Sequence, residues 1–220
     1  MFKEVVIEML KSRKEIAMWL NDHDIEIYTI NEDLSVDVAG SVKLSVHSYS
    51  NGGLPFKFGS ISGNFDCSGN QLSFLENFPY EVLGDFYCGD NYLTSLLGCP
   101  DKVMGCFCCE NNSITSLVGC PELIGLYFNC SSNNLTDLRG CPKIVLDGFH
   151  CVGNKLTTLD YMPEVVKGIF DCRYNGGLLA EVELLDFEQI KQYVSNKNLK
   201  ESLDMNLDIG LVIRSISKKI

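Results

Sequence analysis

A period of 21 residues, which runs through the middle of this 220-residue chain, limits what the chain can fold into more than any other feature. In six successive segments a phenylalanine is followed two residues later by a cysteine, and three residues after that by an asparagine. The six cysteines are Cys67, Cys88, Cys109, Cys130, Cys151 and Cys172. A fixed period of this length is the signature of a solenoid, in which every repeat forms one coil that stacks on its neighbours.

Other positions keep the same period. In the repeat that contains Asn91, leucines follow at Leu93 and Leu96, and Pro100 comes behind an apolar residue. A phenylalanine and a cysteine two residues apart point to the same side of a β-strand. We therefore expect one strand per coil, with these side chains in the core and the strands paired in a parallel sheet. The proline predicts a return path with little helix, and each asparagine should bond to backbone groups at a turn.

The repeat resembles the leucine-rich repeat family, whose pattern L-x-x-L-x-L-x-x-N-x-L is matched by Phe86-Tyr87-Cys88-Gly89-Asp90-Asn91-Tyr92-Leu93 and its counterparts. Phenylalanine and cysteine stand where the family usually has leucine. The Leu-Thr-Ser-Leu and Gly-Cys-Pro elements look most like short repeats of bacterial and bacteriophage proteins. The resemblance implies an α/β-type solenoid with a parallel β-sheet on its concave face, little or no helix on its convex side, and helical or hairpin caps at both ends.

Three segments are expected from these patterns. Residues 1–41 form an N-terminal cap, with an amphipathic helix that breaks near Ser12 and short strands after it. Residues 42–177 form the solenoid, with one degenerate coil and six regular ones. We place Leu44 and Val46 of the degenerate coil one period before Phe65 and Cys67. Residues 178–220 form a helical C-terminal cap, with a helix over 180–194 and an apolar stretch at 211–216.

The charge of the chain excludes several classes of partner. With 18 Lys+Arg against 29 Asp+Glu the formal net charge is −11, and no segment is basic, which argues against nucleic acid. No apolar run approaches the roughly 18 residues of a membrane span, so no membrane partner is expected. The N-terminus carries no export signal. We expect a cytoplasmic protein, in the host cytoplasm if it is phage-encoded, with reduced cysteines.

The cysteine count of 11 is explained by architecture better than by metal binding. Zinc sites need pairs of ligands that converge, whereas in a strand Cys109 points inward and Cys106 and Cys108 point outward. Nine cysteines occupy periodic apolar positions, where a small side chain fills the space between coils. No metal and no cofactor is therefore expected. Cys106 and Cys108, which we place on the exposed face, have no assigned role.

The outward positions of the strands vary while the inward ones repeat, which is typical of a binding surface on a solenoid. The candidate partner-binding residues on and beside these positions are Asp66, Asp85, Tyr87, Cys108, Glu110, Tyr127, Asn129, His150, Asp171 and Arg173. His150, Asn129 and Asp171 come from neighbouring coils and could form a polar cluster. However, no serine nucleophile, phosphate-binding loop or H-E-x-x-H motif accompanies them. The pattern therefore favours a protein that is not an enzyme.

Two functions are favoured at this point, and an enzyme or enzyme-targeting effector is a third, less favoured one. The first is a protein–protein interaction module that uses the concave surface. The resemblance of the repeats to those of bacteriophage proteins implies an accessory protein that binds or inhibits a host factor, such as a defence component. The second is a structural or assembly protein that acts through oligomerisation. We expect a monomer or a weak homo-oligomer. The sequence alone leaves the partner's identity and the choice between concave and convex faces open.

Overall fold

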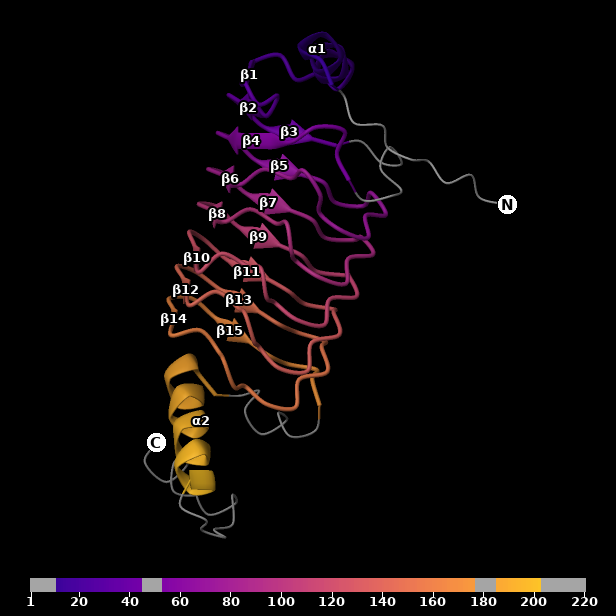
Figure 1. The fold of residues 1–220 in the computed structure, drawn as a ribbon. Coiled ribbons are helices and arrows are strands. Elements are labelled where there is room, and N and C mark those ends of the chain that lie inside the picture. The colour runs from indigo at the N-terminus through magenta and orange to yellow at the C-terminus, as the bar shows by residue number, and fades with distance from the viewer. Residues whose placement is uncertain (1–10, 45–52, 177–184, 203–220) are drawn as a thin grey trace, which may run out of the picture. The chain divides into compact units, whose positions relative to one another are not determined.

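The computed structural model describes residues 11–44, 53–176 and 185–202. The chain divides into two compact units, Met1–Glu183 and Leu184–Ile220, which are described separately below. The first unit is a stack of coils, each of which passes through two short strands (Figure 1). The predicted solenoid is therefore present, with little helix, and it is a parallel β-solenoid of about six turns.

The expectation of one strand per coil is wrong, because each coil supplies a strand to each of two sheets. The eight-stranded sheet has the order β1-β2-β4-β6-β8-β10-β12-β14. Its strands are β1 (Tyr28–Ile30), β2 (Val36–Val38), β4 (Phe58–Ile61), β6 (Glu81–Val82), β8 (Lys102–Val103), β10 (Leu123–Ile124), β12 (Ile144–Val145) and β14 (Val165–Val166). All pairs are parallel except the β1–β2 hairpin.

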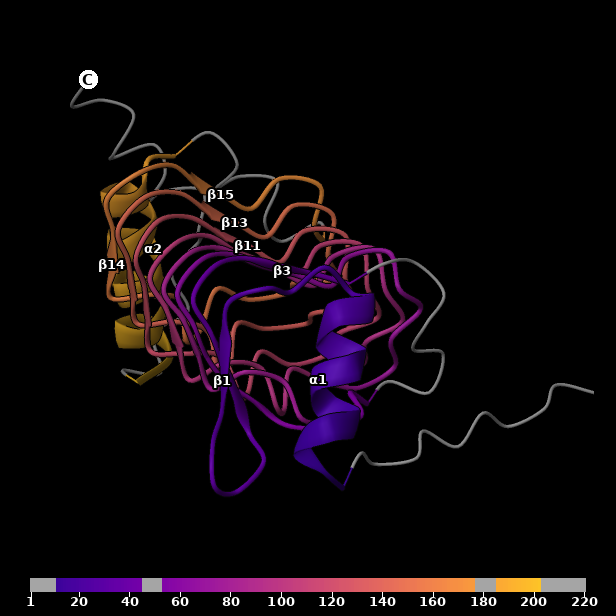
Figure 2. The same cartoon turned by 90° about the horizontal axis from the view of Figure 1, so that it is seen from above.

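The seven-stranded sheet contains the phenylalanines of the repeat. Its order is β15-β13-β11-β9-β7-β5-β3, and every pair is parallel. The strands are β3 (Val42–Lys43), β5 (Phe65–Asp66), β7 (Phe86–Tyr87), β9 (Phe107–Cys108), β11 (Phe128–Asn129), β13 (Phe149–His150) and β15 (Phe170–Asp171). Seen along the stack, the two sheets form adjacent sides of each coil, and the return path closes it (Figure 2).

The core is built from the predicted periodic residues. The phenylalanines from Phe65 to Phe149 are fully buried, and so are the cysteines two residues later from Cys67 to Cys151. The rings of successive phenylalanines follow one another with centroids 5.1 to 6.0 Å apart. The return path contains no helix in the described coils, as the prolines predicted. Burial of the same apolar positions in every coil gives a continuous core.

The asparagine column satisfies the backbone at the turn after the seven-stranded sheet, as predicted. Asn133 is buried, and its Oδ1 accepts a hydrogen bond from the Ile114 N–H at 2.9 Å. Its Nδ2 donates to the carbonyls of Cys109, Cys130 and Ser131 at 3.0 to 3.2 Å. Because Ile114 and Cys109 belong to the preceding coil, each such side chain joins two coils as well as closing its own turn.

The first coil has a different register from the predicted one. Val42 pairs with Phe65 and Lys43 with Asp66, so the offset to the next coil is 23 residues there. The 21-residue period predicts Leu44, rather than Val42, opposite Phe65, and this prediction is wrong. The first coil lacks the phenylalanine, cysteine and asparagine that mark the register in later coils, and its longer return path cannot be read from the period. Residues 45–52 of this path lie outside the described residues.

Helix α1 (Arg13–Asp22) lies across the N-terminal end of the stack (Figure 2). It begins directly after Ser12, whose hydroxyl accepts a hydrogen bond from the Glu15 N–H, and the Glu15 carboxylate in turn accepts from the Ser12 hydroxyl. This reciprocal cap explains the predicted break. The Trp19 ring stands edge-on to Phe56, with centroids 5.1 Å apart. Residues 1–10 of the predicted helix lie outside the described residues.

The second unit contains helix α2 (Phe187–Ser202), which starts later and ends later than the helix predicted over 180–194. Its first turn is closed by Asp186 and Gln189, each of which accepts a hydrogen bond from the other's backbone N–H. The apolar stretch predicted at 211–216 lies outside the described residues. In the part of the chain that the structure describes, no helix has the length and apolar character needed to cross a membrane.

Candidate protein-binding surface

The outward side of the seven-stranded sheet, which we call the seven-strand face, carries the predicted binding residues. Strand pairing places one outward residue per coil in a row, from Asp66 at one end to Asp171 at the other. The row consists of Asp66, Tyr87, Cys108, Asn129, His150 and Asp171. Asp85 and Tyr127 precede their strands by one residue, and Glu110 and Arg173 follow theirs by two. Among the described residues of the first unit, no helix lies over this face (Figure 2).

Near the middle of the face, a tyrosine and an aspartate are linked. The Tyr87 hydroxyl donates to Asp85 Oδ2 at 2.8 Å, and the Cys106 N–H of the next coil donates to Asp85 Oδ1 at 2.7 Å. Burial, together with the bond to this carboxylate, raises the pKa of Tyr87 well above its usual value. Both side chains are half-buried. Asp85 is therefore fixed by its neighbours, and Tyr87 stays neutral and presents its ring on the face.

Side chains at the positions equivalent to Asp85 in earlier coils also accept hydrogen bonds from the backbone of the next coil. Asn64 Oδ1 accepts from the Asp85 N–H at 2.9 Å, and the Ser41 hydroxyl accepts from the Asn64 N–H at 3.0 Å. In each of these coils a side-chain oxygen thus accepts a hydrogen bond from the backbone N–H at the equivalent position of the next coil. This structural role of Asp85 was not predicted, although a run of polar residues at one register was available in the sequence as a signal.

The expectation that Cys106 and Cys108 lie exposed is wrong. They are only 7% and 2% exposed, respectively. The Cys108 thiol donates to the hydroxyl of Tyr127 at 3.4 Å, so the larger side chain from the next coil reaches across it. Burial raises the pKa of Cys108 to about 12 and raises that of Cys106 as well. Both thiols are therefore protonated at neutral pH, and Cys108 is not an accessible contact for a partner.

Glu110 is the one residue of the predicted set with an unsatisfied buried atom. Its Oε2 is buried without a hydrogen-bond partner. The carboxyl group lies over Gly89 of the preceding coil, where a Cβ on the glycine would be 3.1 Å from it. Burial is the main reason that the pKa of Glu110 is raised. A carboxyl group that loses water and gains no donor is held at a cost in free energy.

Acidic residues at the two ends of the face are paired with basic ones. Lys43 Nζ lies 3.5 Å from Asp66 Oδ2. Arg173 donates to both oxygens of Asp171 at 2.9 and 2.6 Å, and these bonds lower the pKa of Asp171. In the part of the chain that the structure describes, neither Asp85 nor Glu110 has such a partner. The uncompensated negative charge of the face is therefore near its middle.

The polar cluster predicted from His150, Asn129 and Asp171 is not joined by hydrogen bonds among the described residues. The carboxylate of Asp171 is held by Arg173, and Asn129 Oδ1 accepts from the N–H of Ser131, two residues later in its own coil. His150 stands edge-on to the ring of Tyr127, with centroids 6.2 Å apart. Strand pairing brings the three residues side by side, as predicted, but each is held by a different neighbour. Within the described residues, no group of three or more metal-ligating side chains is found.

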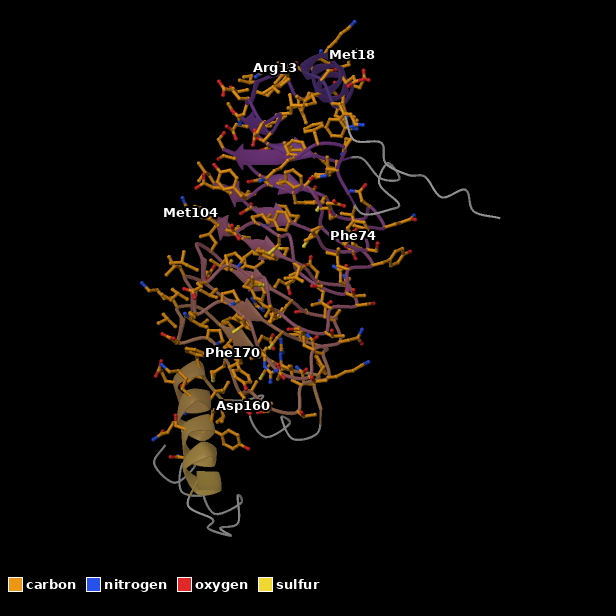
Figure 3. The ribbon with its side chains drawn as sticks, in the orientation of Figure 1. Arg13, Met18, Phe74, Met104, Asp160 and Phe170 are labelled. Carbon is orange, nitrogen blue, oxygen red and sulfur yellow. The ribbon has the colours of Figure 1, made fainter. Side chains whose placement is uncertain are left out.

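A second surface, which sequence reasoning missed, lies on the eight-stranded sheet and the turn after it. Five apolar side chains there are 38 to 44% exposed: Leu83, Met104, Leu123, Leu146 and Val165. We call them the apolar patch. Met104 points away from the stack on this side, while Phe74 points away on another (Figure 3). The strand row that contains Leu123 and Val165 is polar in earlier coils, where Glu81 accepts from Ser60 and pairs with Lys102.

Comparison of the chain with family models, with curated proteins and with solved structures gives no match.

Proposed function

We propose that the protein is a non-enzymatic protein-binding module that acts through the seven-strand face. The observation that carries the proposal is the contrast between the two sides of this sheet. Its inward side repeats phenylalanine and cysteine in every coil, whereas the outward row changes at every step and has no helix over it among the described residues of the first unit. Packing explains the inward repetition but places no requirement on the outward variety.

The chemistry of the face suits a protein partner. Tyr87 and Tyr127 offer large, rigid rings with few rotatable bonds, and Arg173 is anchored by Asp171 in one orientation. Tyrosine and arginine are enriched among the residues that contribute most to binding. The resemblance to leucine-rich repeats supports the same use, with α1 as the cap at the N-terminal end of the stack. Because the repeats resemble short repeats of bacteriophage proteins, we extend the proposal to a cytoplasmic inhibitor of a host factor.

The proposal is tested by affinity capture from a lysate of the source organism or its host. We expect the wild type to retain a specific protein that a Tyr87→Ala, His150→Ala, Arg173→Ala variant loses by about tenfold or more, since hot-spot residues cost about 2 kcal/mol each. The matched control is Tyr92→Ala, Asn134→Ala, Lys155→Ala, which truncates three side chains on the return path instead. Equal recovery of the protein by both triple variants and the wild type would exclude the face as the binding site.

The apolar patch favours a second candidate function, self-association in a structural or assembly role. Five exposed apolar side chains together present on the order of 400 Å², which is the size of the largest apolar patch on a typical monomer, and such a patch is often functional. If two copies meet there, the mass measured by light scattering should rise from monomer toward dimer with concentration. Leu123→Lys with Leu146→Lys should keep the protein monomeric, and Leu97→Lys with Val118→Lys, on the return path, should not. A wild type that stays monomeric at every concentration would remove this candidate.

A further inference from the structure

The middle of the seven-strand face combines an aromatic ring with negative charge on both sides of it. Asp85 precedes Tyr87 by two residues, and Gly89, which lies under the carboxyl group of Glu110, follows it by two. Residues two apart on a strand are separated by about 6 to 7 Å. Asp85 and Gly89 are therefore about 13 Å apart along the strand with Tyr87 between them, so a side chain placed on the ring can bond the carboxyl group on one side and is attracted by the charge on the other.

Among the described residues neither carboxyl group has a basic partner, whereas Asp66 and Asp171 at the ends of the face do. Glu110 is also left with a buried oxygen that has no donor. An unpaired buried acceptor is unfavourable until a donor reaches it, and rotation of the glutamate side chain would present this oxygen to one. The site thus lacks a positively charged donor.

We propose that this site receives an arginine side chain of the protein partner, with the guanidinium on the ring of Tyr87, hydrogen-bonded to Glu110 and attracted by the charge of Asp85. This inference rests on the proposed function and requires an exposed arginine on the partner protein. A guanidinium has several donors in one plane and stacks on aromatic rings, so one group can stack on the tyrosine and donate to the Glu110 carboxylate at the same time. The ends of the face, whose charges are already paired, would contact less polar parts of the partner.

The first test uses a synthetic arginine–glycine peptide as the probe, with lysine–glycine and glutamate–glycine peptides of equal length beside it. Backbone amide signals of the full chain are followed by NMR at about 0.1 M and about 1 M salt, where the screening length falls from about 10 to about 3 Å. We expect the arginine peptide to bind most tightly, to shift Tyr87, Gly89 and Glu110 in particular, and to bind less tightly at high salt. Shifts scattered over all acidic surfaces, or equal affinity for the lysine peptide, would overturn the arginine site.

A pair of variants separates the site from the bulk charge of the protein. Asp85→Asn with Glu110→Gln should weaken the arginine peptide about ten- to a hundredfold, because charged hydrogen bonds are lost. Asp101→Asn with Glu164→Gln removes the same charge from exposed positions away from this face and should change the affinity less than about twofold. The site variant should fold, since Asn64 already makes, one coil earlier, the backbone bond that Asp85 makes. Equal weakening by both pairs would contradict the proposal.

The same variants separate a failure of this inference from a failure of the proposed function. If the Tyr87, His150 and Arg173 variant loses the captured protein while Asp85→Asn with Glu110→Gln keeps it at wild-type level, the face binds a protein without an arginine at this site. If neither variant changes capture, the proposed function falls together with the inference. If both lose capture, the proposed function stands, and the comparison of the arginine and lysine peptides decides the inference.

Discussion

Replacing Asn133 with alanine is expected to lower the free energy of unfolding by about 3 kcal/mol or more, because several buried backbone groups lose a side-chain partner at once. The amide of Asn133 accepts one hydrogen bond and donates three, and it is buried between two coils. Alanine leaves the Ile114 N–H without this acceptor and several carbonyls without this donor. For a protein whose total stability is about 5 to 15 kcal/mol, the loss is a large fraction.

Urea unfolding followed by circular dichroism measures this effect. The matched control is Asn134→Ala, which truncates the next residue, whose side chain is half-exposed. It should change stability by no more than about 0.5 kcal/mol. Asn133→Asp is a second comparison: it keeps the acceptor, loses the donor and buries a charge, so it should also be strongly destabilising. A small effect of Asn133→Ala, similar to that of Asn134→Ala, would show that water or backbone movement replaces the amide.

The asparagine column was predictable because a buried polar residue at a fixed period has few other uses. The same holds for the phenylalanine and cysteine columns, whose spacing of two residues fixes both the strand and its inward side. The second sheet was missed for a physical reason. Its strands in the regular coils are two residues long, with one buried side chain each, such as Val82 and Val103, and one inward residue shows no alternation. The periodic column of valine and isoleucine at these positions was the signal that could have revealed it.

The sequence predicted which side chains lie on the outward side of the sheet, but not which of them are exposed to solvent. Strand alternation places Cys108 and Tyr87 on the same side of the sheet, and strand pairing agrees. Alternation does not show that a small thiol next to the long side chain of Tyr127 is covered by it, as the contact at 3.4 Å indicates. Nor does it show which carboxylates find a basic partner. Those outcomes depend on side-chain length and on neighbours one coil away.

Gly105→Ala is expected to destabilise the stack by about 3 kcal/mol, at the upper end of the range for overpacking. A Cβ at Gly105 would lie 2.6 Å from both the carbonyl carbon and the oxygen of Gly84 in the preceding coil, and closer still to Asp85 Oδ1. The contact with backbone cannot be relieved by a rotamer change, so two coils must separate. Their strands would then lose hydrogen bonds and core packing together.

Gly40→Ala is the matched control, because Gly40 occupies the equivalent turn of the first coil and a Cβ there would meet nothing within 4 Å. Its φ, like that of Gly105, lies outside the left-handed range, so neither substitution is strained by backbone conformation. We expect Gly40→Ala to be neutral or to stabilise the protein by up to about 1 kcal/mol, because alanine lowers the conformational entropy of the unfolded chain. Urea midpoints of the two variants compare these effects directly. Similar midpoints would mean that the coils are spaced more loosely than the contact between Gly105 and Gly84 requires.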